Sequence, residues 1–292
     1  MIANNKVTAA NWAIIAVAVA FVALLYAPYY IPVKIDEYVE YQPLPCTYVI
    51  NLDRATERYR KLKSQLDRYE ISHRRFSAVD GYELRILSNI TFDKFSGLDL
   101  KSGKVKLHLN SSYQVFCPHF IFHYTPNRDL FPRTLGPGEL GCYCSHVEVW
   151  RDIKNKGFPF VLILEDDAVI SDDFDKKLQA VLHNLPKGWD VVNIQRSTRA
   201  NGKLRPIAGN SIIEKVNPDN ELFHHTTSYL ISASGALKLI NYARSSPWAI
   251  DDVISDAINK RVITVYDAKD ILVIYQPDNS EKSIISKMGR GN

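Results

Sequence analysis

Short apolar runs alternate with amphipathic helical segments along most of the chain, and this alternation restricts the possible folds. The run "CTYVINL", residues 46–52, is rich in β-branched side chains, which favour a strand. Apolar side chains then recur at helical spacing up to residue 71, with Asp53 as the predicted N-cap. A second extended run, "HRRFSAVDG", completes a strand–helix–strand unit. The pattern predicts an α/β fold with a mainly parallel sheet and helices on both faces.

The later elements continue the alternation. A helix is predicted to begin near Pro137, which suits a first helical position, and to end at Gly157 as its C-terminal cap. The helix after the next strand has Ser171 or Asp172 as its predicted N-cap. The remaining strands are predicted at 158–164, 189–194, 221–232, 262–266 and 271–275, and the remaining helices at 172–185, 233–245 and 251–260.

Residues 82–133 lack a sustained period. They carry scattered aromatic side chains and two glycosylation sequons, at Asn89 and Asn110. We expect an irregular insertion beside a binding face.

The N-terminus predicts a membrane anchor. Residues 7–33 contain no charged side chain, and residues 12–30 would form an apolar helix of ~27 Å, close to the thickness of a bilayer core. Residues 1–33 are therefore expected to anchor a single-pass membrane protein, with a stalk at 34–45. A cleaved signal peptide is the alternative, and the side of the membrane stays open.

Composition and charge restrict the class of protein to which the remaining chain can belong. The formal charge of +4 is small for 292 residues, so it gives no case for a nucleic-acid partner. No Gly/Ser-rich or Pro-rich linker divides the chain after the stalk, which predicts one domain at 46–276 and a tail at 277–292. The four cysteines lack zinc-type C-x-x-C spacing, and they are expected to be small buried or partly buried residues.

Three consecutive acids, Glu165, Asp166 and Asp167, follow the predicted strand 158–164. In parallel sheets, ligands bind beyond the carboxyl ends of the strands. Carboxylates are preferred ligands of Mg²⁺ and Mn²⁺, which leave positions for the oxygens of a diphosphate. The acids therefore indicate a metal–diphosphate site, although one of them could instead cap the next helix while the others are solvated.

Four motifs in this order resemble the landmarks of glycosyltransferase family 25, the lipopolysaccharide and collagen galactosyltransferase group. The resemblance covers about residues 46–276, and it implies a GT-A-like fold and a UDP-sugar donor. It also implies transfer with inversion and a Mn²⁺ (or Mg²⁺) ion held by the acidic triplet. The motifs are "YVINLDRATERYRKL", "LGPGELGCYCSHVEVWRDI", "LILEDDAVI" and "SPWAIDDVI".

Individual roles follow partly from this resemblance. Similar proteins use the edge that carries Asn51, Arg54 and Arg58 for the uridine and phosphates, which suits the geometry of arginine. Glu139 and His146 are seven residues apart on one helix face, so both could reach the donor pocket; a surface ion pair is the alternative.

Within the acidic triplet, the resemblance implies Asp167 and Glu165 as metal ligands. It places Asp166 nearer the nucleotide ribose.

An inverting transfer needs a general base away from the metal. Asp251 and Asp252 are the candidates, although one of them could be a simple N-cap. His224, His225 and Thr226 are weaker candidates for contact with the metal or the acceptor.

The sequence thus predicts a membrane-anchored, metal-dependent hexosyltransferase. It would move a hexose, above all galactose, from a UDP-sugar to a glycan on a lipid or protein acceptor. Two alternatives remain open: a metal-dependent hydrolase of nucleotide diphosphates, and a catalytically silent relative that binds glycans or acts as a scaffold.

Overall fold

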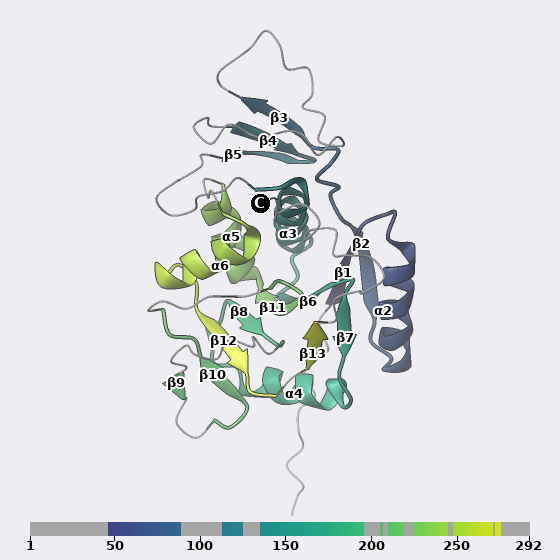
Figure 1. The fold of residues 1–292 in the computed structure, drawn as a ribbon. Coiled ribbons are helices and arrows are strands. Elements are labelled where there is room, and N and C mark those ends of the chain that lie inside the picture. Colours follow the sequence, from purple (N-terminus) through teal and green to yellow (C-terminus); the bar gives the residue numbers. More distant parts are fainter. Residues whose placement is uncertain are drawn as a thin grey trace, which may run out of the picture. The chain divides into compact units, whose positions relative to one another are not determined.

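The computed structural model describes residues 46–88, 113–124, 135–195, 205–206, 210–218, 223, 225–244, 248–270 and 272–275 (Figure 1). The predicted anchor at 1–33, stalk at 34–45 and tail at 277–292 lie outside these residues, as do both sequons.

An eight-stranded sheet forms the centre of the described chain. Its order is β2-β1-β6-β11-β8-β12-β10-β9. The pairs β2–β1, β1–β6 and β8–β12 are parallel. β11 is antiparallel to both neighbours, and so is β10, so these two run against the other six strands. The strands are β1 (Cys46–Asn51), β2 (His73–Ser77), β6 (Phe160–Glu165), β8 (Val191–Asn193), β9 (Arg205–Pro206), β10 (Ile213–Lys215), β11 (Ser228–Ser232) and β12 (Val265–Ala268).

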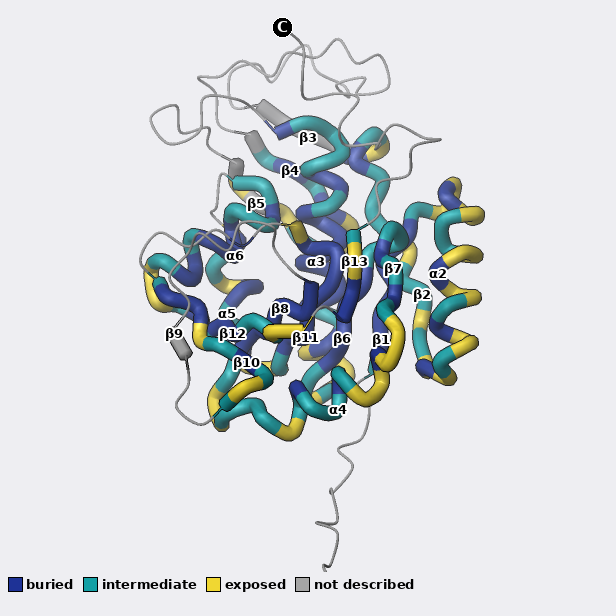
Figure 2. Tube along the Cα trace, turned by 60° about the horizontal axis from the view of Figure 1, so that its bottom comes forward, coloured by how far each residue is buried: buried dark blue, intermediate teal, exposed yellow. Residues whose placement is uncertain are grey.

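Helices cover both faces of this sheet, as predicted. Side chains of β6 alternate between two apolar cores, with Val161 and Ile163 in one and Leu162 and Leu164 in the other. The first core holds α3, α5 and α6, and the second holds α2 and α4. Figure 2 shows the central strands as the most deeply buried elements. The helices are α2 (Thr56–Arg68), α3 (Pro137–Lys156), α4 (Phe174–Asn184), α5 (Ala233–Ala243) and α6 (Ile250–Asn259). The mixed α/β class with a mostly parallel sheet is therefore confirmed.

Both ends of α3 agree with the sequence. Pro137 occupies its first turn, and Gly157 ends it in the left-handed region with φ 69°.

The predicted N-caps of two other helices are wrong. Ala55 precedes α2, while Asp53 accepts a hydrogen bond from Arg75 on the neighbouring strand at 2.6 Å. Asp173, not Ser171 or Asp172, occupies the N-cap position of α4, and it has a left-handed conformation. A partner on another element thus decided where Asp53 points, and local spacing could not reveal that partner.

The predicted insertion is not wholly irregular. Its described parts form an antiparallel three-stranded sheet, β3 (Arg85–Ser88), β4 (Tyr113–Cys117) and β5 (Phe120–Tyr124). A disulfide joins Cys117, at the end of β4, to Cys144 in α3. All four cysteines are buried or partly buried, as predicted, but the sequence did not indicate this bond; Cys46 and Cys142 are free.

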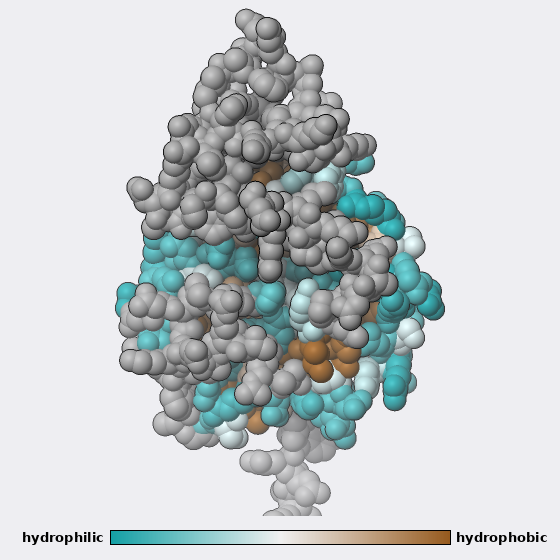
Figure 3. Space-filling model, viewed as in Figure 1, coloured by the Kyte–Doolittle hydropathy of each residue, from teal (hydrophilic) through white to brown (hydrophobic). Residues whose placement is uncertain are grey.

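A small ribbon lies beside the acidic triplet. It pairs β7 (Ala168–Ile170) with β13 (Val273–Tyr275) in antiparallel register, with Tyr275 opposite Ala168. Ile274 on β13 is half exposed. In Figure 3, hydrophobic colour gathers where β13 lies in Figure 1, while most of the described surface around it is hydrophilic. The sequence suggested β13 but not its short partner, because β7 has only three residues.

The predicted localisation as a single-pass membrane protein is contradicted. None of the helices in the described part of the chain combines the length and the apolarity needed to traverse a bilayer. The apolar segment that motivated this prediction lies outside the described residues.

The disulfide should contribute measurably to stability. Its partners are 27 residues apart, so replacing both by serine is expected to lower the free energy of unfolding by about 2–4 kcal/mol. Denaturant unfolding with and without a reductant measures the effect. The reductant should destabilise the natural protein and a Cys46→Ser control, but it should leave the double variant unchanged. Equal sensitivity of all three proteins would contradict the assignment.

Candidate functional site

The acidic triplet lies where three strands bring their ends together. Ile50 of β1 pairs with Glu165 of β6, so Asn51 lies next to the triplet. Because β11 is antiparallel to β6, its first residue, Ser228, pairs with Leu164. The segment before β11 therefore reaches the same edge, together with the carboxyl ends of two parallel strands.

Most of the predicted donor-site residues line one pocket at this edge. It lies between the loops after β1 and β2, the first half of α3 and the end of β6. Its lining residues are Ile50, Asn51, Leu52, Arg54, Arg58, Ala78, Val79, Asp80, Gly81, Tyr82, Gly138, Gly141, Cys142, Ser145, His146, Glu165, Asp166 and Asp167.

Arg58 and Asn51 hold two of the three acids. One terminal nitrogen of Arg58 lies 2.5 Å from Asp166 Oδ1 and 3.0 Å from Asp167 Oδ2. Asn51 Nδ2 donates to Asp166 Oδ2 at 2.7 Å, and its Oδ1 accepts from Arg75 at 2.8 Å. Arg58 thus contacts two acids of the triplet, and Asp166 is held from two sides.

Asp167 keeps an unused oxygen. Its Oδ1 is buried and has no hydrogen-bond partner among the described residues. Burial, followed by the nearby charge of Glu165, raises the pKa of Asp167 from 3.8 to about 7. Burial also raises the pKa of Asp166, although Arg58 opposes that change. The site therefore holds excess negative charge and an open carboxylate oxygen, which suits a cation.

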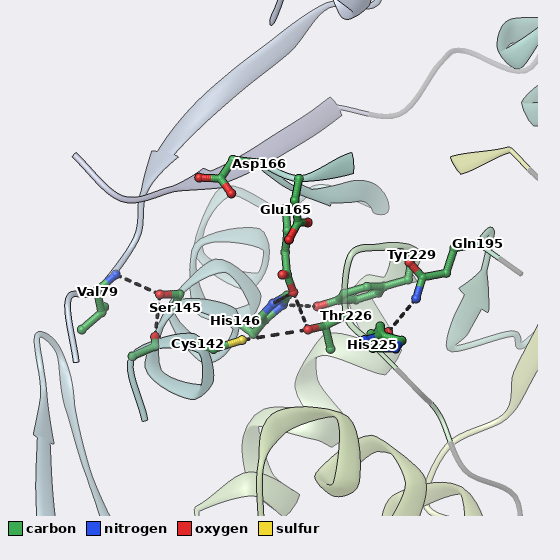
Figure 4. Close-up of polar contacts among 12 residues, drawn as sticks. Val79, Cys142, Ser145, His146, Glu165, Asp166, Gln195, His225, Thr226 and Tyr229 are labelled. Atoms are coloured by element: carbon green, nitrogen blue, oxygen red, sulfur yellow. Dashed lines mark hydrogen bonds and ion pairs between the residues drawn. The ribbon is translucent and has the colours of Figure 1, made fainter. Parts of the chain in front are cut away.

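Glu165 ends a chain of hydrogen bonds that reaches into the core (Figure 4). Trp150 donates to the Tyr229 hydroxyl oxygen at 2.9 Å, and that hydroxyl lies 2.8 Å from His146 Nδ1. His146 Nε2 lies 3.2 Å from Glu165 Oε1, and Thr226 donates to the same oxygen at 2.5 Å. If Tyr229 donates its proton to Nδ1, a neutral His146 carries its own proton on Nε2, directed at Glu165.

These contacts control the charge of Glu165. Burial opposes its ionisation, but His146, Thr226 and Arg58 together hold the pKa of Glu165 below its usual value. Sequence reasoning identified His146 and gave Thr226 as a weak candidate, but it missed Tyr229 and Trp150. Both lie inside regular elements and look like ordinary core aromatics from sequence alone.

Two other predicted donor-binding residues, Glu139 and Arg54, have partners within the protein. Glu139 is not among the pocket-lining residues. Its Oε2 accepts from the backbone nitrogen of Gly136 at 2.8 Å, so it caps the start of α3. Of these two side chains of α3, only His146 therefore lies in the pocket. Arg54 does line the pocket, where it forms an ion pair with Asp80.

Asp251 is the better placed of the two base candidates. It lies in the first turn of α6, partly buried, and the charges of His225 and Glu165 both act on it. Burial raises its pKa, while hydrogen bonds from the backbone, including that of Asp252, oppose the change. His225 has a left-handed conformation with φ 61°, and its ring stacks on Tyr275 at 5.2 Å. His224 lies outside the described residues.

Comparison with known proteins identifies the family. The family model described as Glycosyltransferase family 25 (LPS biosynthesis protein) matches residues 45–254, more than half of the chain. The chain therefore belongs to glycosyltransferase family 25.

Its relatives carry mixed descriptions. The chain is 28% identical over 210 residues to the "Probable inactive glycosyltransferase 25 family member 3" of Rattus norvegicus, covering 66% of this chain and 29% of that protein. It is 25% identical over 225 residues to the "Procollagen galactosyltransferase 2" of Homo sapiens, covering 75% and 31%. It is 26% identical over 218 residues to the "Procollagen galactosyltransferase 1-B" of Xenopus laevis, covering 72% and 30%. The chain thus spans about a third of the length of these relatives.

The crowded carboxylates predict an unusual pH dependence of the free energy of unfolding when a chelator is present. In the folded protein Asp167 has a pKa of about 7, whereas its ordinary value is 3.8. Between these values the folded state binds a proton that the unfolded chain releases, so stability falls as the pH rises towards 7. Asp167→Asn should reduce this fall, because Asp166 and Asp251 keep raised pKa values, and it should be more stable than the natural protein at pH 8 by about 1–4 kcal/mol.

Denaturant unfolding at pH 4.5 and pH 8 in a chelator checks this expectation. Asp175→Asn, which changes an exposed aspartate of α4, is the matched control and should follow the natural protein. An Asp167→Asn variant that is less stable than the natural protein at pH 8 would contradict the predicted charge repulsion.

Proposed function

We propose that this protein transfers a hexose, above all galactose, from a UDP-sugar to a glycan on a lipid or protein acceptor. The transfer is metal-dependent and inverts the anomeric centre. The proposal includes a GT-A-like form of the mixed α/β fold, in which the nucleotide lies against the carboxyl edge of β1 and β6.

One observation carries this proposal. In a member of glycosyltransferase family 25, the acids Glu165, Asp166 and Asp167 line a single pocket with Asn51 and Arg58. A second cavity adjoins this pocket along the loops after β1 and β2, and its lining shares Arg54 and Asp80. Together they offer room beside the acids for the nucleotide part of a donor.

The acidic triplet fits the Mn²⁺ or Mg²⁺ ion that the family implies. Asp167 Oδ1 is an unpartnered, buried carboxylate oxygen, and Glu165 lies in the same pocket. These two side chains would hold the ion, with Asp166 turned to the ribose. When bound, the ion supplies charge neutralisation for the departing diphosphate.

The remaining chemistry rests on side chains of the chain itself. Asp251 accepts the proton of the acceptor hydroxyl, and its burial makes it a stronger base than an exposed aspartate. Arg58 keeps Asp166 and Asp167 in place before the donor arrives. The hydrogen-bonded chain through His146 fixes the orientation of Glu165.

Asp167→Asn tests the metal site. It should reduce metal-dependent transfer by more than about 10³-fold, because it removes a metal ligand and neutralises part of the acidic triplet. A screen of UDP-sugars, read as Mn²⁺-dependent UDP release with and without glycan acceptors, supplies the substrate and the assay. Asp175→Asn serves again as the control. Full activity of Asp167→Asn would show that the metal assignment is wrong.

Separate substitutions of the two adjacent aspartates test which of them is the general base. Asp251→Asn should lower kcat by about 10²–10⁴-fold and leave UDP binding unchanged, because general-base catalysis contributes that much. Asp252→Asn should have a much smaller effect. The pH profile of kcat/KM should also lose its acidic limb in the Asp251 variant only. The reverse ranking would assign the base to Asp252.

A catalytically silent protein is the second candidate function. The observation that favours it is that a relative from Rattus norvegicus is described as probable inactive, and one from Mus musculus as inactive. Titration calorimetry separates the two candidates when it is combined with the transfer assay. Metal-dependent UDP binding with turnover supports the transferase, whereas glycan binding without UDP binding or turnover supports the silent relative.

A further inference from the structure

Three different metal-ligating side chains converge on the inner wall of the pocket. Cys142 Sγ, His146 Nε2 and a carboxylate oxygen of Glu165 all lie within 4.8 Å of one another. Cys142 and His146 are four residues apart in α3, so they share one helix face, and Glu165 approaches from the end of β6 (Figure 4). Regular elements therefore fix all three positions.

The surroundings suit a bound ion. All three side chains line the pocket, which gives an ion a route of entry. The Cys142 thiol is free, and its Thr226 contact is long, at 3.9 Å. His146 is held through its other ring nitrogen by Tyr229, which is the outer contact that metal-binding histidines commonly have.

We propose that Cys142, His146 and Glu165 form a binding site for a thiolate-preferring divalent ion, Zn²⁺ above all. This site is separate from the proposed Mn²⁺ site at Asp167 but shares Glu165 with it. A thiolate, an imidazole and a carboxylate with one open position form a coordination set that zinc accepts. Manganese stands lowest in affinity for such a site among the first-row divalent ions.

Binding requires a defined exchange of protons. The thiol of Cys142 loses its proton to solvent as the sulfur–zinc bond forms. The imidazole ligates through the Nε2 lone pair, so its proton lies on Nδ1 and is donated to the oxygen of Tyr229. That oxygen has a second lone pair beside the one used by Trp150. Ligand atoms around a tetrahedral zinc are about 3.5 Å apart. His146 Nε2 and Glu165 Oε1 already lie 3.2 Å apart, so it is Cys142 Sγ, within 4.8 Å of its partners, that must move closer.

If both sites exist, zinc and manganese compete for Glu165. Because Glu165 belongs to both sites, zinc at Cys142 removes one ligand from the manganese site. Zinc should therefore inhibit the proposed transfer, and excess Mn²⁺ should relieve the inhibition. This consequence rests on the proposed function, whereas the existence of the zinc site does not.

Cobalt(II) provides a direct spectroscopic probe of the site. The metal-free full chain is titrated with Co²⁺ without oxygen and without reductant, so that the Cys117–Cys144 disulfide stays closed. We expect a thiolate-to-cobalt charge-transfer band with the visible absorption of a tetrahedral ion, which Zn²⁺ should remove. Cys142→Ser should lose the charge-transfer band and bind Zn²⁺ more than about 10-fold more weakly.

Two matched variants complete the test. Cys46→Ser removes the other free cysteine, and it should keep the band. Asp167→Asn should also keep the band, even though it is expected to lose transfer activity. A failure of the transferase proposal therefore leaves this result unaffected. The absence of a charge-transfer band in the natural protein, or its persistence in Cys142→Ser, would overturn the proposal.

A measurement on the natural protein covers the case in which Cys142→Ser does not fold. Zn²⁺ should slow the alkylation of Cys142 by N-ethylmaleimide relative to that of Cys46, as measured by peptide mass spectrometry. Equal slowing at both cysteines would count against the site.

Discussion

The contact of Arg58 with Asp166 and Asp167 is the interaction on which the site depends. Three successive carboxylates at the end of a buried strand repel one another and lose hydration. One guanidinium from α2 offsets part of that cost, while Asn51 restrains Asp166 and His146 restrains Glu165. The compensation is incomplete, as the raised pKa of Asp167 indicates. A folded protein that retains such repulsion has an electrostatic reason to bind a cation there.

The reversed direction of β11 decides what surrounds these acids. Were β11 parallel to β6, its carboxyl end would reach the pocket edge. Instead the segment before it arrives there, and this segment supplies Thr226 to Glu165 and His225 to the neighbourhood of Asp251. Tyr229, inside the strand, links the same edge to the core through His146. One strand direction therefore joins the acidic group, its hydrogen-bonded support and the candidate base.

The sequence predicted those features that are determined by residues close together in the chain or by the regular spacing of apolar side chains. The ends of α3 at Pro137 and Gly157 are set by backbone preferences, and the acidic group follows its strand directly. Partners distant in sequence could not be predicted in this way. Glu139 was expected in the pocket, but it satisfies the free backbone groups at the start of its own helix. The Cys117–Cys144 bond likewise depends on a small sheet whose short strands carried no clear period.

That bond also ties the inserted sheet to the helix wall of the pocket. Cys144 is two residues from Cys142 and from His146, so the covalent link enters α3 in the turn that faces the acids. A chain that matures without the link would keep every residue of the site, yet its inserted sheet could shift relative to α3. Preparations of identical sequence would then differ in how firmly the inserted sheet is held to α3, according to the oxidation history of two side chains that do not line the pocket.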